Sequence, residues 1–237
     1  MGKAMGGGGG GGGSSDLVVR NAGFYYQGAG STTTVFVYCP FAGYNGKYAL
    51  IAIMHRDTLT APADCTLIDK TTYESNGVTQ YVSVFKAHID SDLKVYQFIQ
   101  PAYTRVCNSL WVVENDFQLE KISTTEFDYF AEKCQLKTTD QTFFTFNAVA
   151  GSSSYDVAAV ADGAWLNQPY VHTSIFPMQS GALNYDSAQT KDLRFFSGLI
   201  PSTKTQKTTE IYQTAFASNT THDPVKAQVV SYTISPA

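Results

Sequence analysis

Apolar segments along this chain are short, and turn-forming residues interrupt them at regular intervals from Leu17 onward. Each segment is about five to seven residues long, which is the length of a β-strand and less than that of most helices. In Tyr81–Lys86, the side chains of Val82 and Val84 fall on one side of an extended chain and their neighbours on the other. Ala49–Met54 is apolar on both sides, as in a central strand. The pattern therefore predicts β-sheets.

Composition supports the same fold class. Charged residues make up 15% of the chain, against roughly 25% in ordinary soluble domains, and Tyr and Phe number 15 each. Aromatic side chains favour strands. We expect strands at Leu17–Arg20, Thr34–Tyr38, Tyr48–His55, Thr66–Asp69, Tyr81–Ala87, Lys94–Ile99 and Ser109–Glu114, with turns at Gly43–Gly46, Glu74–Gly77 and Asp90–Asp92. Thr125–Gln135, between the two halves, is the one stretch with a helical pattern.

The second half of the chain repeats the order of the first. Thr142–Asn147 is similar to Thr34–Tyr38, Ser154–Ala161 to Lys47–Met54, Lys191–Ile200 to Gln80–Ile89, and Ala227–Ile234 to Asn108–Glu114. We interpret this as a diverged internal duplication, although short strands of any two β-sandwiches can be aligned this loosely. The prediction is an all-β protein with a leader at 1–16, an antiparallel jelly-roll or immunoglobulin-like β-sandwich at 17–122, a linker at 123–135 and a second sandwich at 136–237.

A run of eight glycines stands ahead of the first strand. It consists of Gly6, Gly7, Gly8, Gly9, Gly10, Gly11, Gly12 and Gly13. Glycine has no side chain to bury and loses more backbone entropy on ordering than any other residue, so this leader cannot be a core element. We interpret it as a tether that attaches the folded part to an assembly. A cloning linker stays open as the alternative.

Bulk properties argue against several classes of protein. With 16 Lys and Arg against 20 Asp and Glu, the formal charge of −4 offers no positive field for nucleic acid. No stretch approaches 18 consecutive apolar residues, so we expect no membrane insertion. Nothing indicates a cofactor. The cysteines, which lack any C-x-x-C spacing, are expected as free buried thiols: Cys39, Cys65, Cys107 and Cys134.

Motifs that resemble catalytic ones lack their partners. His55-Arg56-Asp57 imitates the start of a kinase catalytic loop, but Pro62 stands where that motif has its metal-binding Asn. No G-x-S-x-G elbow is present, and the four histidines are too scattered for a metal site. We therefore predict no catalytic and no metal-binding residues. Whether Asp90 and Asp92, two positions apart in a turn, bind a cation is left open.

Aromatic residues in expected loops are the best candidates for contact with a ligand or partner. They are Tyr25, Tyr26, Tyr44, Tyr73, Tyr103, Trp165 and Tyr170. Tyr and Trp combine an apolar ring with a polar group, which suits carbohydrate rings and protein partners alike. The alternative for each is packing against the end of a sandwich or a neighbouring subunit.

Four segments of the first half carry a resemblance to a known family. Lys47–His55, Leu59–Ile68, Gln80–Lys86 and Ser109–Glu114 resemble the tandem β-sandwich modules of bacteriophage virion and tail surface proteins. Asp64 and Cys65 stand where that family has Gly and Trp, and Trp165–Pro169 is only loosely similar to the corresponding turn of the second module. The resemblance covers most of residues 17–116 and, more faintly, 136–236.

The resemblance implies a non-enzymatic structural protein of a phage particle, assembled in the bacterial cytoplasm. A tail-tip, fibre or spike component would contribute to assembly and to host-surface recognition. Its partners would be other virion proteins, further copies of itself in a trimer, and a host-surface glycan or protein. Two alternatives remain at this point: a capsid decoration or head-fibre protein anchored by its leader, and a cellular carbohydrate-binding or adhesin module.

Overall fold

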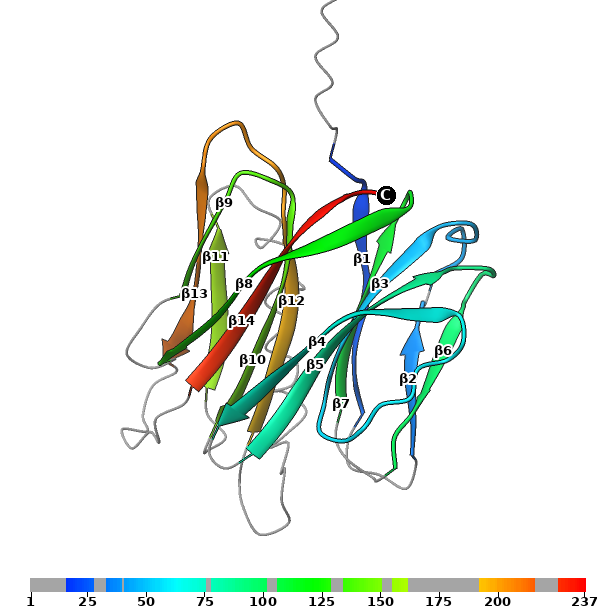
Figure 1. Ribbon diagram of the computed structural model, residues 1–237, viewed down its shortest axis with the longest axis horizontal. Helices are drawn as coiled ribbons and strands as arrows, with labels where there is room; N and C mark the ends of the chain where they lie inside the picture. The colour runs from blue at the N-terminus through cyan, green and yellow to red at the C-terminus, as the bar shows by residue number, and fades with distance from the viewer. Residues whose placement is uncertain are drawn as a thin grey trace, which may run out of the picture.

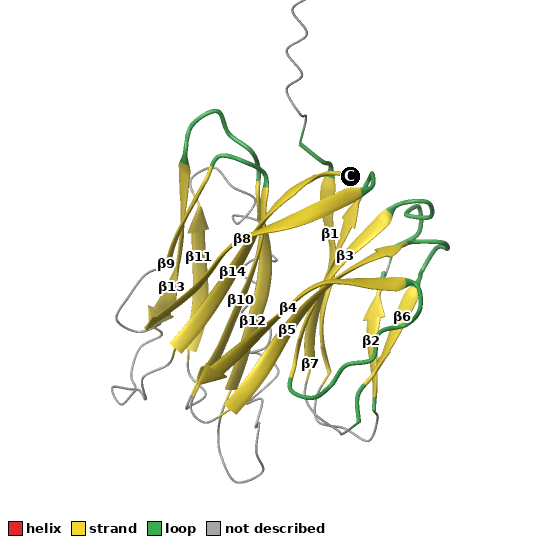
Figure 2. Cartoon of the chain, viewed as in Figure 1, coloured by secondary structure: helices red, strands yellow, loops and turns green. Residues whose placement is uncertain are grey.

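The computed structural model describes residues 16–27, 33–39, 41–75, 78–101, 106–128, 134–150, 155–161, 192–215 and 226–237. Within these ranges all regular structure is β-strand (Figure 2). The strands are β1 (Val19–Gln27), β2 (Thr34–Tyr38), β3 (Tyr48–His55), β4 (Cys65–Ser75), β5 (Val78–His88), β6 (Val95–Ile99), β7 (Val106–Val113), β8 (Phe117–Asp128), β9 (Cys134–Thr138), β10 (Thr142–Ala150), β11 (Tyr155–Ala161), β12 (Asp192–Ile200), β13 (Lys207–Ala215) and β14 (Lys226–Pro236). The predicted all-β fold is confirmed.

The strands form four antiparallel sheets that stack in layers (Figure 1). A five-stranded sheet, ordered β1-β7-β3-β5-β4, faces a four-stranded sheet, ordered β12-β10-β14-β8. The two-stranded sheet β2-β6 covers the other face of the five-stranded sheet, and the three-stranded sheet β11-β13-β9 lies beyond the four-stranded one. Both large sheets are thus covered on both faces, which explains why β3 is apolar on both sides.

One core lies between the two large sheets. Leu50, Ala52 and Met54, alternate residues of β3, contribute one side of it, and Phe143 and Tyr232 contribute the other. The rings of Phe143 and Tyr232 lie 6.1 Å apart. We call this whole core, which also includes Leu17, Tyr73, Trp111 and Phe117, the central cluster. Because its members come from both halves of the chain, the two halves bury their apolar surface against each other.

A second core lies on the opposite face of the five-stranded sheet. The residues of β3 that alternate with those above point into it, where they meet the inward side chains of β2 and β6: Ala49, Ile51, Ile53, Val35, Val37, Tyr96 and Phe98. The period of two in β6 is complete, since its residues are exposed and buried in strict alternation.

The described residues of Thr125–Gln135 are in strands, so the helix expected from their pattern is wrong there. Residues up to Asp128 belong to β8, and Cys134 begins β9. β8 is an edge strand of the four-stranded sheet, so many of its side chains are exposed and its apolar residues do not form a run. The expected domain boundary after residue 122 therefore falls inside a strand. Glu74 and Ser75, expected in a turn, likewise extend β4.

Strand pairing repeats between the halves. The order β1-β7-β3-β5 in one large sheet corresponds to β8-β14-β10-β12 in the other, and β2-β6 corresponds to β9-β13. In this scheme β10 occupies the place of β3, whereas the sequence comparison matched it to β2. The matches of β12 with β5 and of β14 with β7 agree with the sequence. The duplication itself stays a prediction.

Two smaller expectations can be compared with the described residues. Cys39, Cys107 and Cys134 are buried free thiols as expected, while Cys65 is only partly buried. No helix in the described ranges is long and apolar enough to cross a membrane.

A substitution in the central cluster tests whether the halves unfold together. We expect Phe143→Ala to lower the free energy of unfolding by about 3–5 kcal/mol, because it removes a buried ring from the contact between halves. Urea unfolding should stay a single transition by both circular dichroism and tryptophan fluorescence. Ile122→Ala, at a half-exposed position, should change stability by less than about 0.5 kcal/mol. Two separate transitions, only one of them shifted by Phe143→Ala, would contradict the shared core.

Candidate functional site

The structure describes only part of the expected contact set. Tyr103, Trp165, Tyr170 and the glycines of the leader lie outside the described residues. Tyr25 and Tyr26 lie within β1, opposite Asn108 and Cys107 of β7, not in a loop. The sequence therefore misplaced these two tyrosines, because β1 continues well past the strand expected at Leu17–Arg20.

The two remaining tyrosines differ from each other. Tyr73 lies inside β4 instead of at a turn, and its side chain is 1% exposed in the central cluster, so it is not available for contact with a ligand. Tyr44 does lie in the turn between β2 and β3, where it is partly exposed. The ring of Phe41 packs edge-on against it at 6.5 Å, and Lys47 Nζ lies 5.9 Å from its ring centroid.

The carboxylates of Asp90 and Asp92 are directed to different partners. Asp90 pairs with Lys94 at 2.9 Å and accepts a hydrogen bond from the Ser91 hydroxyl at 3.1 Å. Asp92 accepts a hydrogen bond from the backbone N–H of Gly43 at 2.8 Å, where Gly43 has a φ of 88°. The hydrogen bond from Lys94 lowers the pKa of Asp90. Asp90 thus acts within its own turn, whereas Asp92 joins that turn to the turn between β2 and β3.

Asp16, the last residue of the leader, and the adjoining Leu17 together form what we call the leader root. The backbone N–H of Leu17 donates to Gln141 Oε1 at 2.9 Å, and Gln141 Nε2 donates back to the Leu17 carbonyl at 2.9 Å. Asp16 accepts hydrogen bonds from the backbone N–H of Ser202, at 2.9 Å, and from its hydroxyl. Leu17 is buried in the central cluster. The leader root is therefore fixed to the second half of the chain.

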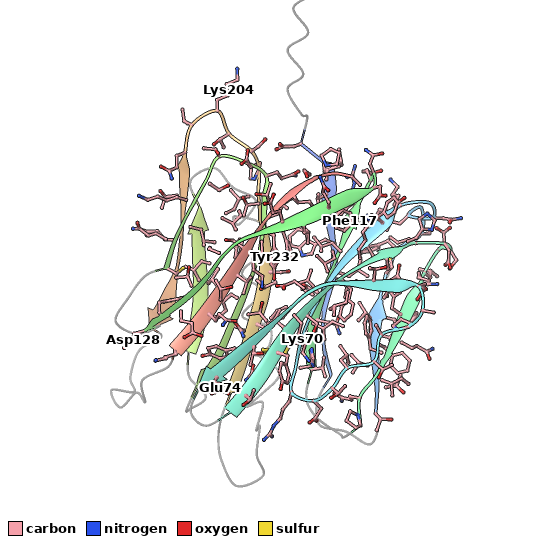
Figure 3. The ribbon with its side chains drawn as sticks, in the orientation of Figure 1. Lys70, Glu74, Phe117, Asp128, Lys204 and Tyr232 are labelled. Atoms are coloured by element: carbon pink, nitrogen blue, oxygen red, sulfur yellow. The ribbon has the colours of Figure 1, made fainter. Side chains whose placement is uncertain are left out.

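Both described ends of the chain lie at one end of the molecule, which we call the leader end (Figure 1). The N–H of Ala237 donates to the Asp116 carbonyl at 3.2 Å, and the N–H of Glu114 donates to the Val18 carbonyl at 3.0 Å. Figure 3 labels Phe117 at this end. The turn between β7 and β8 thus joins Val18, which follows the leader root, to the C-terminal residue.

Ion pairs lie along the strand ends of the five-stranded sheet at the leader end. Glu114 pairs with Lys47 and, at 3.2 Å, with Arg20. Lys86 pairs with Asp116. The hydrogen bond from Lys47, aided by Arg20, lowers the pKa of Glu114, and the hydrogen bond from Lys86 lowers the pKa of Asp116. At neutral pH these carboxylates are therefore ionised and held in place.

A hollow of about 320 Å³ opens beside these pairs. It is lined by Tyr48, Asp64, Thr66, Lys86, Ala87 and His88. The residues come from the start of β3, the start of β4 and the end of β5, which antiparallel pairing brings together. Such a volume is at the lower end of the range for small-ligand sites, roughly 300–1,000 Å³. This hollow and the leader root are the two candidate functional sites.

A buried serine and histidine form a third polar group, which the sequence did not reveal. His55 Nδ1 lies 2.7 Å from the Asp57 carbonyl oxygen, and His55 Nε2 lies 2.8 Å from Ser83 Oγ. Since a carbonyl only accepts, Nδ1 carries the proton and Ser83 donates to Nε2. Hydrolases activate a serine this way, but here both side chains are 2% exposed, out of reach of a substrate. The sequence could not predict this pair, because His55 and Ser83 lie on different strands and are far apart along the chain.

Comparisons with known proteins add little to this geometry. No family model matches the chain, and no curated protein matches it either. Among solved structures, it is similar to a protein from Eubacterium rectale that is proposed to be secreted. That match covers 90% of this chain and 74% of the other, with 9% sequence identity and a TM-score of 0.22.

The buried histidine makes stability depend on pH. Burial lowers the pKa of His55 from 6.5 to about 4. Between these two values the unfolded chain binds a proton that the folded chain does not, so the free energy of unfolding decreases as pH falls. The loss should be about 3 kcal/mol between pH 7 and pH 4, at about 1.4 kcal/mol per pKa unit.

Urea unfolding at several pH values checks this prediction. His55→Gln should remove most of the decrease in the free energy of unfolding between pH 7 and pH 4. His88→Gln, at an exposed position, should leave that decrease unchanged. Equal pH dependence in wild type and His55→Gln would show that other groups control the acid response.

Proposed function

We propose that this chain is a non-enzymatic structural protein of a bacteriophage particle, attached through its glycine-rich leader. In this proposal it belongs to the tail tip, a fibre or a spike, where it contributes to assembly and host-surface recognition. Several copies, with a trimer as the expected oligomer, would give the particle avidity for a surface even if each site bound weakly.

The leader root is the observation that carries the proposal. A leader that attaches the folded part to a particle has to transmit force, and the residues at its base must then be held firmly by that folded part. Here the side-chain amide of Gln141, itself 6% exposed, makes both hydrogen bonds to the backbone of Leu17. Because Gln141 and Ser202 belong to the second half while β1 belongs to the first, a force on the leader is distributed over both large sheets.

The reach of the leader suits attachment to a partner. At least 15 residues precede Asp16. A glycine-rich chain of this length has a root-mean-square end-to-end distance of about 20 Å and a maximum of about 50 Å. Without side chains, the eight glycines would also fit a narrow passage between other subunits.

The same observation supports a second candidate, a capsid decoration or head-fibre protein. The leader would then occupy a pocket on the capsid, and the β-sheets would project outward. Separation of heads from tails distinguishes the two candidates. Mass spectrometry should find the chain in one fraction at a fixed copy number. Its absence from purified particles would contradict both.

Removal of the leader tests attachment directly. We expect deletion of Gly6–Gly13 to reduce the copies retained per particle by about tenfold or more, since the tether becomes too short. The unfolding midpoint should not change, because the described fold begins at Asp16. A variant in which every second glycine of the run is replaced by Ser keeps length and flexibility, and should be retained like wild type. Unchanged retention of the deletion variant would rule out the tether.

A further inference from the structure

We propose that the hollow at the leader end binds one neutral sugar ring of a surface glycan. This inference deepens the proposed recognition role, on which it rests, by naming the site and the ligand class. None of the residues that line the hollow was among the aromatic residues expected to make contacts.

Two aromatic side chains, Tyr48 and His88, line one side of the hollow. Tyr48 and His88 are paired across β3 and β5, and their rings meet edge-on with centroids 5.3 Å apart. Tyr48 also packs against the central cluster, which limits its movement. The C–H faces of a sugar ring pack on aromatic side chains of this kind, while its hydroxyls remain free for hydrogen bonds.

Lys86 supplies one hydrogen-bond donor. Its ammonium group has three protons. It pairs with Asp116, donates to the Phe117 carbonyl at 2.6 Å, and lies 5.5 Å from the Tyr48 ring centroid. Two protons are thus committed to partners that hold the group in place, and the third can be donated to a ligand oxygen. A donor fixed in this way loses little entropy when it binds.

Asp64 and Thr66 supply acceptors on the side of β4. Asp64 Oδ2 is 2.8 Å from Lys94 Nζ, so the carboxylate is oriented while its side chain remains 38% exposed. Thr66 is exposed, and its hydroxyl can donate or accept. The hydrogen bond to Asp64 also raises the pKa of Lys94, which keeps this pair charged.

The charged groups around the hollow favour one class of ligand over others. Asp64 and Asp116 disfavour an anion, and Lys86 with Lys94 disfavours a cation, so no net charge is favoured in the hollow. Adjacent sugar hydroxyls each donate and accept, which matches an ammonium donor beside a carboxylate acceptor. A neutral hexose ring therefore fits better than a phosphate, an amino sugar or an apolar group.

Nuclear magnetic resonance on the full-length chain tests the inference. We would add D-glucose, D-galactose or D-mannose, each up to about 100 mM, to the isotope-labelled protein. At least one should cause saturable shifts confined to the lining residues, with a Kd of about 1–10 mM. Asp64→Asn and His88→Ala should each weaken binding about tenfold, while thermal unfolding stays within about 2 °C of wild type.

Tyr38→Ala provides the matched control, because this exposed aromatic residue lies on the two-stranded sheet and does not line the hollow. It should bind the sugar like wild type. No shifts with any of the three sugars, or binding that Asp64→Asn leaves unchanged, would overturn the inference. Either result is independent of particle retention, which is measured without a sugar, so failure of this inference and failure of the proposed attachment can be told apart.

Discussion

The contact between the two large sheets is the interaction on which the rest of the molecule depends. Trp111, fully buried in the five-stranded sheet, packs edge-on against Phe143 of the four-stranded sheet with ring centroids 6.4 Å apart. Its Nε1–H donates to Ser197 Oγ at 2.8 Å, and the same hydroxyl bonds with Ser109 at 2.7 Å. A large apolar ring therefore brings its one polar atom to a partner in the opposite half, and the contact buries apolar area without leaving that donor unpaired.

This contact holds both candidate sites in position. Leu17 belongs to the same cluster as Trp111, so the point where the leader departs is part of the core. Lys86 reaches Phe117, whose side chain is fully buried in that cluster, and so the wall of the hollow is fixed to it as well. The leader root and the proposed sugar site therefore both contact this core at one end of the molecule, although they lie far apart in sequence.

The sequence predicted most reliably what depends on local pattern. β2 and β3 have the expected bounds, because buried strands alternate or are apolar throughout. Edge strands were harder: β8 carries charged residues and half-exposed positions, so nothing in it distinguishes strand from helix. The hollow could not be predicted, since Tyr48 and His88 become neighbours only through the register of β3 with β5. Tyr73 was expected at a turn because polar residues surround it in the sequence. Its direct neighbours Thr72 and Glu74 are exposed, while Tyr73 itself points into the core.

Polar contacts decide how the two apolar faces are aligned. Apolar packing is not directional, so two flat hydrophobic sheets could slide past each other at little cost. Asp69 of β4 prevents this, because it accepts hydrogen bonds from Tyr232 at 2.8 Å and Thr71 at 3.1 Å and pairs with Lys121 at 2.6 Å. Burial alone would raise the pKa of Asp69, but these donors outweigh it and lower the pKa, so the carboxylate stays ionised. Gln228 adds a hydrogen bond of 3.1 Å to the carbonyl of Thr72. Any shift of β14 along β4 would break these bonds and leave a charge partly buried without its partners, which costs more than the apolar contact could recover.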